Sequence, residues 1–205
     1  MFIKCCGFQD EATIETAVHN KVDAIGFITF PKSKRYVTIE DIGTLSERIP
    51  NYIDIVAVVV NLSFAEIERL VEQTSINTIQ FHGDETIDFI KHINGKCPHS
   101  KTYKAFPAND SLFNNIKTFQ DDVDLFLIDT PSKNYGGTGK SYDWSLLNEI
   151  KDISYLIAGG INVDKIKQIE QLNLNNAGYD ISSGIETNGQ KDHNKIETLL
   201  TYVKG

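Results

Sequence analysis

The apolar run Leu125 to Ile128 ends abruptly at a carboxylate, Asp129. In an extended chain every second residue shares a face, so Asp129 shares its face with two leucines while the opposite face is apolar as well. A strand that is apolar on both faces belongs to a parallel sheet covered by helices, and such sheets bind ligands beyond the carboxyl ends of their strands. The pattern predicts that Asp129 places an acid in a binding site.

Polar residues from three other apolar stretches are expected on the same inner surface. Alternation turns Lys4 and Cys6 inward from the first stretch, Gln80 and His82 from the fourth, and Asp180 from the last. Each residue also has an ordinary interpretation, since a buried cysteine is often inert, a histidine can be satisfied within a loop, and an aspartate can cap a turn. Their convergence on one surface is what favours a functional site.

Lys4 and Asp180 are harder to explain as ordinary buried residues, because a buried charge needs a partner. Closure of a barrel would make the first and last strands neighbours, so we expect these two side chains to form an ion pair close to Cys6. The positive charge of Lys4 would then lower the pKa of the Cys6 thiol. In the alternative arrangement, Asp180 faces the substrate hydroxyls and another carboxylate satisfies Lys4.

Two loops predict a phosphate site. Gly159-Gly160 follows the seventh apolar stretch and Ser182-Ser183-Gly184 follows the eighth, and each leads towards a helix. In barrels, phosphate is often bound by these two loops through backbone N–H groups, so we assign Gly159, Gly160, Ser183 and Gly184 to it. The ordinary alternative is that the glycines only connect a strand to a helix.

Another stretch, Gly136 to Lys140, lacks the spacing of a nucleotide-binding P-loop, and we interpret it as an active-site loop.

The elements that would position these residues are eight apolar stretches, each followed by an amphipathic helical pattern, at intervals of roughly 25 residues. Asp10, Ser63 and Asn162 are expected helix caps, and helices are expected near residues 86–93, 112–119 and 144–150. Eight such units predict a single-domain (β/α)8 TIM barrel spanning residues 1–205, at the short end for this fold. The competing fold is an open doubly wound sheet, which usually has fewer strands and a glycine fingerprint after the first one. The predicted strands are 2–6, 24–30, 53–60, 78–81, 102–106, 125–130, 155–158 and 178–181.

Composition restricts the class of protein further. The 205 residues are 40% hydrophobic and 23% charged, with a formal net charge of -8, as in an ordinary soluble domain that binds neither nucleic acid nor anionic membranes. Three cysteines form neither a disulfide framework nor a CxxC metal pair, so we expect a reducing compartment and no bound metal. The sequence shows no signal peptide and no apolar segment of membrane-spanning length, which predicts a cytoplasmic protein.

These residues together resemble the phosphoribosylanthranilate isomerase family of tryptophan biosynthesis, and the resemblance runs from end to end. Two residues depart from the family pattern: Val163 stands where proline is usual and Lys165 where asparagine is usual. The segments that carry the resemblance, in family order, are Lys4-Cys5-Cys6-Gly7, Phe30 to Tyr36, Gln80 to Glu85, Leu127 to Thr130, Gly136 to Lys140, Asp143-Trp144, Gly159-Gly160 and Asp180 to Glu186.

The resemblance implies an Amadori rearrangement, in which N-(5'-phosphoribosyl)anthranilate becomes its 1-deoxyribulose phosphate isomer. By similarity, Asp129 is the general acid, Cys6 as thiolate is the general base, and Arg35 pairs with the anthranilate carboxylate. Gln80, His82 and Asp180 are then expected to contact the substrate, with Lys4 in support. An iminium intermediate would serve as the electron sink, so no cofactor is expected, and the only partner implied is a small phosphoribosyl substrate, with no obligate protein partner.

Two other functions compete with this interpretation of the sequence. A related barrel acting on a ribosyl aminoimidazole carboxamide would be expected to use two carboxylates, and Cys6 stands where the first would be. The other rival is a barrel that binds phosphosugars without turnover, and the presence of Cys6, Asp129 and Arg35 together weighs against it.

Overall fold

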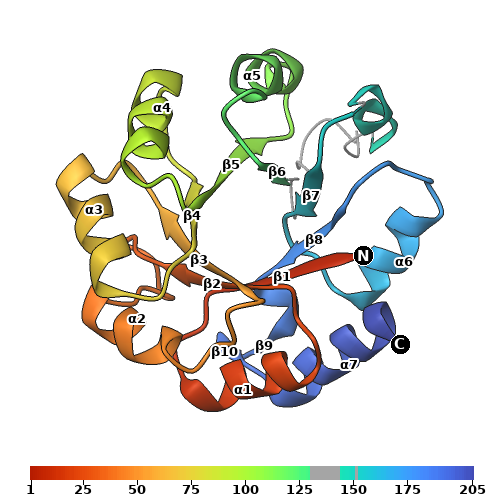
Figure 1. The fold of residues 1–205 in the computed structure, drawn as a ribbon. Coiled ribbons are helices and arrows are strands. Elements are labelled where there is room, and N and C mark those ends of the chain that lie inside the picture. Colours follow the sequence, from red (N-terminus) through yellow and green to blue (C-terminus); the bar gives the residue numbers. More distant parts are fainter. Residues whose placement is uncertain (130–143, 151) are drawn as a thin grey trace.

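The eight strands close into a barrel. In the computed structural model, which describes residues 1–129, 144–150 and 152–205, parallel strands follow one another in sequence order, and β1 pairs with both β2 and β8 (Figure 1). Closure confirms the predicted (β/α)8 fold and excludes the open doubly wound sheet. That the whole chain forms one domain stays a prediction. The strands are β1 (Phe2–Cys6), β2 (Ala24–Ile28), β3 (Asp54–Val59), β4 (Thr78–Phe81), β5 (Lys101–Pro107), β6 (Leu125–Asp129), β7 (Tyr155–Ala158) and β8 (Gly178–Ile181).

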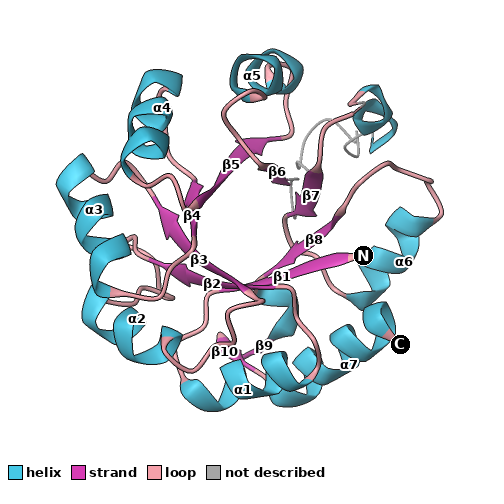
Figure 2. Cartoon of the chain, viewed as in Figure 1, coloured by secondary structure: helices cyan, strands magenta, loops and turns pink. Residues whose placement is uncertain are grey.

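The helices surround the barrel (Figure 2), and the three caps expected from the sequence are present. Asp10 accepts a hydrogen bond from the Thr13 N–H, and Ser63 forms a capping box that includes the Glu66 side chain. Such caps satisfy N–H groups that have no partner within the helix. The helices are α1 (Glu11–His19), α2 (Ile39–Ser46), α3 (Phe64–Gln73), α4 (Ile87–Lys96), α5 (Leu112–Phe119), α6 (Val163–Glu170, capped by Asn162) and α7 (His193–Lys204).

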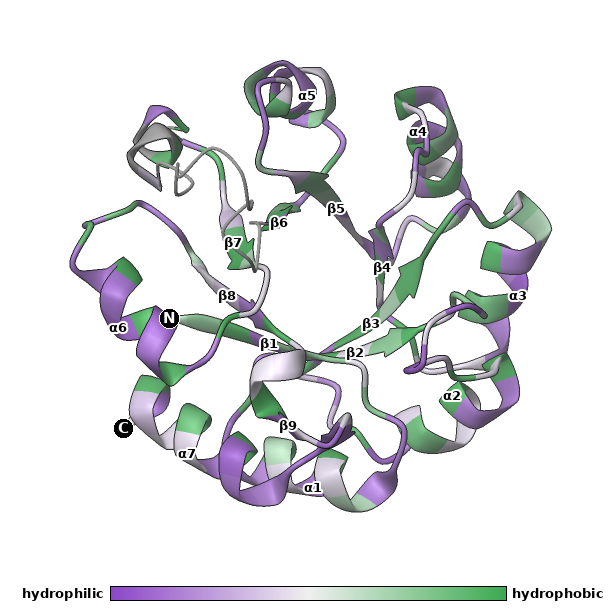
Figure 3. Ribbon diagram, turned by 180° about the vertical axis from the view of Figure 1, so that it is seen from behind, coloured by the Kyte–Doolittle hydropathy of each residue, from purple (hydrophilic) through white to green (hydrophobic). Residues whose placement is uncertain are grey.

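Two apolar cores follow from strand alternation. The larger core lies between the strands and the helices, and it takes Cys5, Ile79 and Phe81 from the strands. The smaller core fills the barrel interior with the alternate residues, among them Ala24 and Leu127. In Figure 3 the strands are mostly hydrophobic, while the helices carry both hydrophilic and hydrophobic residues. The inward orientation that alternation predicts is therefore the observed one.

Strands β3 and β5 differ from their predicted bounds by one residue at each end, and three other local features differ from the expectations as well. Strand β2 ends at Ile28 rather than residue 30, because the chain turns at Pro31, where the Ser33 N–H donates to the Phe30 carbonyl at 2.9 Å. Residues 144–149 form a short helix of the 3₁₀ type, η1 (Trp144–Glu149), where a short helix over 144–150 was expected. An antiparallel hairpin of β9 (Glu186–Thr187) and β10 (Gln190–Lys191) follows the eighth strand and was not predicted.

The two termini lie close together. The Lys204 ammonium donates a hydrogen bond to the Met1 carbonyl at 2.9 Å, and Figure 1 shows α7 ending near the start of β1. Within the described residues, no helix combines the length and apolar character needed to cross a membrane.

Candidate active site

A cavity of about 330 Å³ opens at the carboxyl ends of the barrel strands. This size is within the range of pockets that bind small molecules. Of the residues singled out from the sequence, Gly184 and the fully buried Lys4 do not line it. Those that do are Cys6, Arg35, Gln80, His82, Asp129, Gly159, Gly160, Asp180 and Ser183.

Lys4 and Asp180 form the ion pair expected from barrel closure. The Lys4 Nζ lies 2.8 Å from the Asp180 Oδ1, and the two residues are register partners in the β1–β8 pairing. Burial lowers the pKa of Lys4, but Asp180 and then Cys6 raise it by more, so the pKa lies above its usual value. Lys4 is therefore a buried, charged ammonium just behind the cavity wall.

The two adjacent cysteines have different surroundings. Cys5 lies in the core between strands and helices, where burial raises its pKa to about 12. Cys6 lines the cavity, and its pKa is also raised by burial, while Lys4 lowers it, Asp180 raises it and Lys191 lowers it. Lys4 thus acts in the predicted direction, but burial has the larger effect, so the pKa of Cys6 lies above its usual value rather than below it.

Asp129 is the last residue of β6 and lines the cavity. Burial of its carboxyl raises its pKa, His82 lowers it, Asp180 raises it and Lys165 lowers it, with a net increase. A carboxyl with a raised pKa is better able to remain protonated and to donate a proton. Burial lowers the pKa of His82, which favours the neutral imidazole beside this acid.

Arg35 reaches the cavity from the loop after β2, and its guanidinium is bound by Glu186. The Arg35 Nε and Nη2 lie 2.6 and 2.8 Å from the two carboxylate oxygens of Glu186, and the Lys191 Nζ lies 2.9 Å from one of them. Neither Glu186 nor Lys191 was proposed from the sequence as a site residue. The signal that could have found them is Asn188-Gly189, a dipeptide typical of two-residue hairpins, which pairs the strands that carry both side chains.

The two loops assigned to phosphate come together at the mouth of the barrel. Gly159 and Gly160 have positive φ angles of 95° and 62°, a conformation that favours glycine. A Cβ on Gly184 would lie 1.8 Å from the Ile161 carbonyl oxygen, so the loop after β8 packs directly on the loop after β7. Gly159, Gly160 and Ser183 line the same cavity as Cys6.

Two buried side-chain oxygens of cavity-lining residues have no hydrogen-bond partner among the described residues. They are the Oε1 of Gln80 and the Oγ of Ser182, and both residues line the cavity. Buried polar atoms are normally paired, so these two are suited to bind polar groups of a ligand. Gln80 was expected at the site from the sequence, whereas Ser182 belongs to a loop expected there but was not itself assigned a role.

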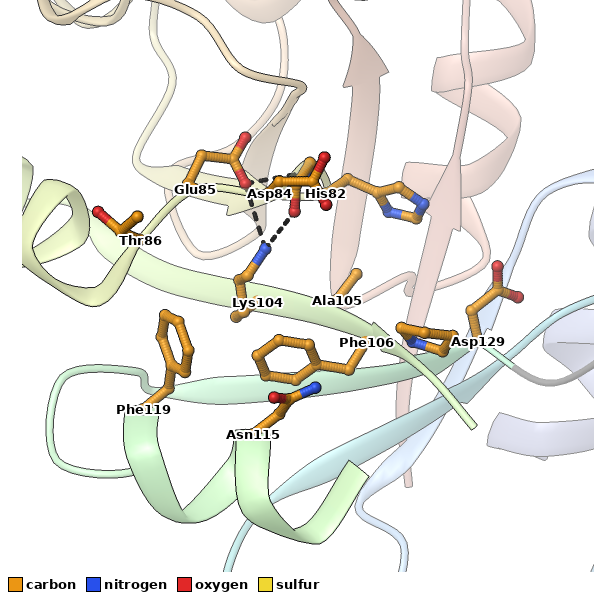
Figure 4. Close-up of a pocket in the computed structure, with 12 residues that line it drawn as sticks. His82, Asp84, Glu85, Thr86, Lys104, Ala105, Phe106, Asn115, Phe119 and Asp129 are labelled. Carbon is orange, nitrogen blue, oxygen red and sulfur yellow. Dashed lines mark hydrogen bonds and ion pairs between the residues drawn. The ribbon is translucent and has the colours of Figure 1, made fainter. Parts of the chain in front are cut away.

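A second cavity, of about 540 Å³, adjoins the first and shares His82 and Asp129 with it (Figure 4). Its opposite wall holds a buried ion pair, in which the Lys104 Nζ lies 3.1 Å from Glu85 and 2.7 Å from the Gly83 carbonyl. Lys104 is therefore satisfied by the protein itself. This cavity contains neither Cys6 nor the glycine loops, so the candidate chemistry belongs to the smaller one.

Some segments that the sequence singled out cannot be placed in this site. Gly136 to Lys140, Thr130 and Asp143 lie outside the described residues. Among the described residues, no group of three or more His, Cys, Asp or Glu side chains is arranged to hold a metal ion.

The fold and the site define a TIM-barrel protein with a thiol, a carboxyl group and two glycine loops around one cavity. The family model described as N-(5'phosphoribosyl)anthranilate (PRA) isomerase matches residues 3–201. A relative from Staphylococcus carnosus (strain TM300), named N-(5'-phosphoribosyl)anthranilate isomerase, is 51% identical over 205 residues, covering 100% of this chain and 98% of its own. The chain belongs to the N-(5'-phosphoribosyl)anthranilate isomerase family, as the resemblance in the sequence predicted.

Solved structures of the same family also match this chain. The phosphoribosyl anthranilate isomerase of Thermotoga maritima is 29% identical with a TM-score of 0.87, covering 100% of this chain and 99% of that one. A phosphoribosyl anthranilate isomerase in complex with reduced 1-(o-carboxyphenylamino)-1-deoxyribulose 5-phosphate is 26% identical with a TM-score of 0.85 and the same coverage.

Proposed function

We propose that this chain catalyses the Amadori rearrangement of N-(5'-phosphoribosyl)anthranilate to 1-(2-carboxyphenylamino)-1-deoxyribulose 5-phosphate in tryptophan biosynthesis. The observation that carries the proposal is the full-length identity of 51% to a named isomerase, together with a thiol and a carboxyl group in one cavity. We infer that the reaction takes place in the cytoplasm on a small-molecule substrate, without a cofactor.

The first step needs an acid, and Asp129 is the residue we assign to it. Protonation of the ribose ring oxygen lets the bond from C1' to that oxygen break while the anilino nitrogen donates its lone pair and becomes an iminium. Burial raises the pKa of Asp129, which supports a protonated carboxyl at the start of the reaction.

The second step needs a base, and Cys6 is the residue we assign to it. The Cys6 thiolate removes the C2' proton, the electrons flow into the iminium, and the resulting enolamine tautomerises to the ketone. The Lys4 ammonium favours the thiolate of Cys6, while burial of Cys6 opposes it. The thiolate is therefore a minority form of Cys6, and it is a strong base once it has formed.

Substrate binding is assigned to the two ends of the cavity. We assign the phosphate to backbone N–H groups of Gly159, Gly160, Ser183 and Gly184, and the anthranilate to the end at Arg35. Four apolar side chains line the cavity together with Arg35, which suits an aromatic ring that carries a carboxylate: Ile28, Phe30, Val58 and Val60. Gln80, His82 and Asp180 are left for the ribose hydroxyls.

The test is turnover of phosphoribosylanthranilate by the purified chain, followed by the loss of its fluorescence. Conversion that requires Cys6 and Asp129 is the expected result. Binding of the substrate without conversion would contradict the proposal and favour a phosphosugar-binding barrel instead.

A further inference from the structure

Arg35, Glu186 and Lys191 form a compact charged cluster beside the cavity. Glu186 accepts hydrogen bonds from Arg35 at 2.6 and 2.8 Å and from Lys191 at 2.9 Å. The Glu186 and Lys191 side chains are only 6% and 3% exposed, so neither is a surface group. Arg35 alone of the three lines the cavity.

The hairpin of β9 and β10 holds this cluster in place. Glu186 and Lys191 are register partners across it, and Asn188 and Gly189 form its turn with φ angles of 54° and 82°. The Lys191 Nζ also donates to the Ser182 carbonyl at 2.9 Å, which ties the hairpin to the end of β8. Glu186 is thus fixed from two sides, by Lys191 and by Arg35.

Only part of the Arg35 guanidinium is used by Glu186. The carboxylate takes the Nε hydrogen and one hydrogen of Nη2, which leaves the Nη1 group and the second hydrogen of Nη2 as donors. A planar fork held along one edge presents its remaining edge in a single direction. Arg35 lines the cavity and Glu186 does not, which is the arrangement needed for the free edge to meet a ligand there.

We propose that Glu186 is a positioning residue, which holds the Arg35 fork so that its free edge meets the aromatic carboxylate of the substrate. The inference rests on the proposed function, in which Arg35 binds that carboxylate. Lys191 neutralises Glu186 from the other side, so that Arg35 keeps its net attraction for an anion. In the opposing interpretation, Glu186 occupies the place of the substrate carboxylate and competes with it for Arg35.

A change of Glu186→Gln separates these two roles by the sign of its effect. The amide cannot accept two charge-assisted hydrogen bonds in the same way, so a positioned fork would be loosened. The same change removes a negative charge, which would strengthen anion binding if Glu186 were only a competitor or a background charge. Weaker binding therefore means positioning, and stronger binding means competition.

The experiment measures KM and kcat for phosphoribosylanthranilate, and dissociation constants for reduced 1-(o-carboxyphenylamino)-1-deoxyribulose 5-phosphate and for ribulose 5-phosphate. Glu186→Gln is expected to raise KM and the dissociation constant of the aromatic ligand roughly tenfold, as for loss of one charge-assisted hydrogen bond. Binding of ribulose 5-phosphate and kcat are expected to change little, and Glu186→Asp should restore part of the loss. An unchanged or lower dissociation constant for the aromatic ligand in Glu186→Gln would overturn the proposal.

Two further variants complete the test. Glu40→Gln is the matched control, because it removes an exposed carboxylate that pairs with Arg69 at 2.5 Å, away from the cavity. In an Arg35→Met background, Glu186→Gln should add no further loss, since a positioning residue acts through the residue it holds. A full additional loss there would also overturn the proposal. Circular dichroism and the thermal midpoint of each variant show whether the barrel is intact.

Failure of the proposed carboxylate contact has a different signature. If Arg35→Met leaves binding of the aromatic ligand unchanged, then Arg35 does not bind the carboxylate, and both assignments fail. If Arg35→Met weakens that binding and Glu186→Gln does not, the contact survives and only the positioning role is overturned.

Discussion

At the scale of single residues, the site is built on charge pairs placed next to the groups that we assign to proton transfer. Lys4 is the clearest case, because it is fully buried, binds Asp180 and lowers the pKa of the neighbouring Cys6. Alternation along β1 and β8, together with closure of the barrel, predicted this pair. The net pKa of Cys6 was not predictable in this way, because it depends on the desolvation of the thiol, which only the packed structure gives.

Lys4→Met should raise the pKa of Cys6 further and lower stability. The apolar side chain removes the charge that favours the thiolate and leaves the Asp180 carboxylate without its partner, at a cost of about 3 kcal/mol. The alkylation rate of Cys6 as a function of pH should therefore shift to higher pH, and the thermal midpoint should fall. Lys101→Met is the control, since it breaks the Lys101–Asp54 pair at 2.7 Å without touching the thiol. An unmoved alkylation profile in Lys4→Met would show that the ammonium does not act on Cys6.

The division of work between Cys6 and Asp129 predicts a bell-shaped dependence of kcat/KM on pH. The reacting form has Cys6 deprotonated and Asp129 protonated. Because the carboxyl has the lower pKa of the two, this form is a minority, and its fraction is largest between the two pKa values. The rate therefore falls below the pKa of Asp129 and above that of Cys6. Burial raises both pKa values, so both limbs should lie at higher pH than for an exposed carboxyl and thiol. Measurement of kcat/KM against pH checks the positions of the limbs.

Removal of either group should abolish most of the rate. Cys6→Ser and Asp129→Asn are each expected to lower kcat by roughly 10²–10⁴-fold, the usual effect of losing a general acid or base. Thermal unfolding of the two variants should stay near that of the parent, because both side chains face the cavity rather than the core. Turnover near the parental rate in either variant would refute its assigned role.

At the scale of elements, sequence patterns located the strands and caps well and the connections less well. Period-two alternation and cap residues such as Ser63 are local signals, and each appears in the structure. The hairpin that carries Glu186 and Lys191 has strands of only two residues, too short for an alternation pattern, although its Asn-Gly turn is a recognisable signal. Glu186 and Lys191, which were missed, therefore lie on the shortest strands.

The loops after β7 and β8 predict contrasting results for two substitutions. Ser183→Ala keeps the backbone N–H groups and should change KM little. Gly160→Val should raise KM markedly, because valine is strained at a φ of 62° and adds bulk at the loop that lines the cavity. Inorganic phosphate inhibition of both variants gives a second readout. Equal effects of the two changes would argue against binding by backbone groups.

At the scale of the whole molecule, the two ends of the barrel carry different tasks. The carboxyl ends of the strands hold the cavity, while the opposite end is closed by polar contacts among strand residues. There the Tyr103 hydroxyl donates to the Asp54 carboxylate at 2.5 Å, and Lys101 pairs with the same carboxylate. Tyr103 lies in the interior core, and burial followed by its bond to Asp54 raises its pKa above the usual range. In barrels of this kind the end opposite the ligand site serves stability.

Tyr103→Phe should therefore destabilise the protein without affecting turnover. The variant loses a buried hydrogen bond to a charged group, which is expected to cost about 1.5–3 kcal/mol of unfolding free energy. For a chain of this size, each kcal/mol corresponds to roughly 2–4 °C in the thermal midpoint. Because Asp54 keeps Lys101 as a partner, the barrel should still close, and kcat/KM at a temperature well below the midpoint should match the parent. A large loss of kcat/KM with an unchanged midpoint would mean that this end of the barrel is coupled to the site, contrary to this separation of tasks.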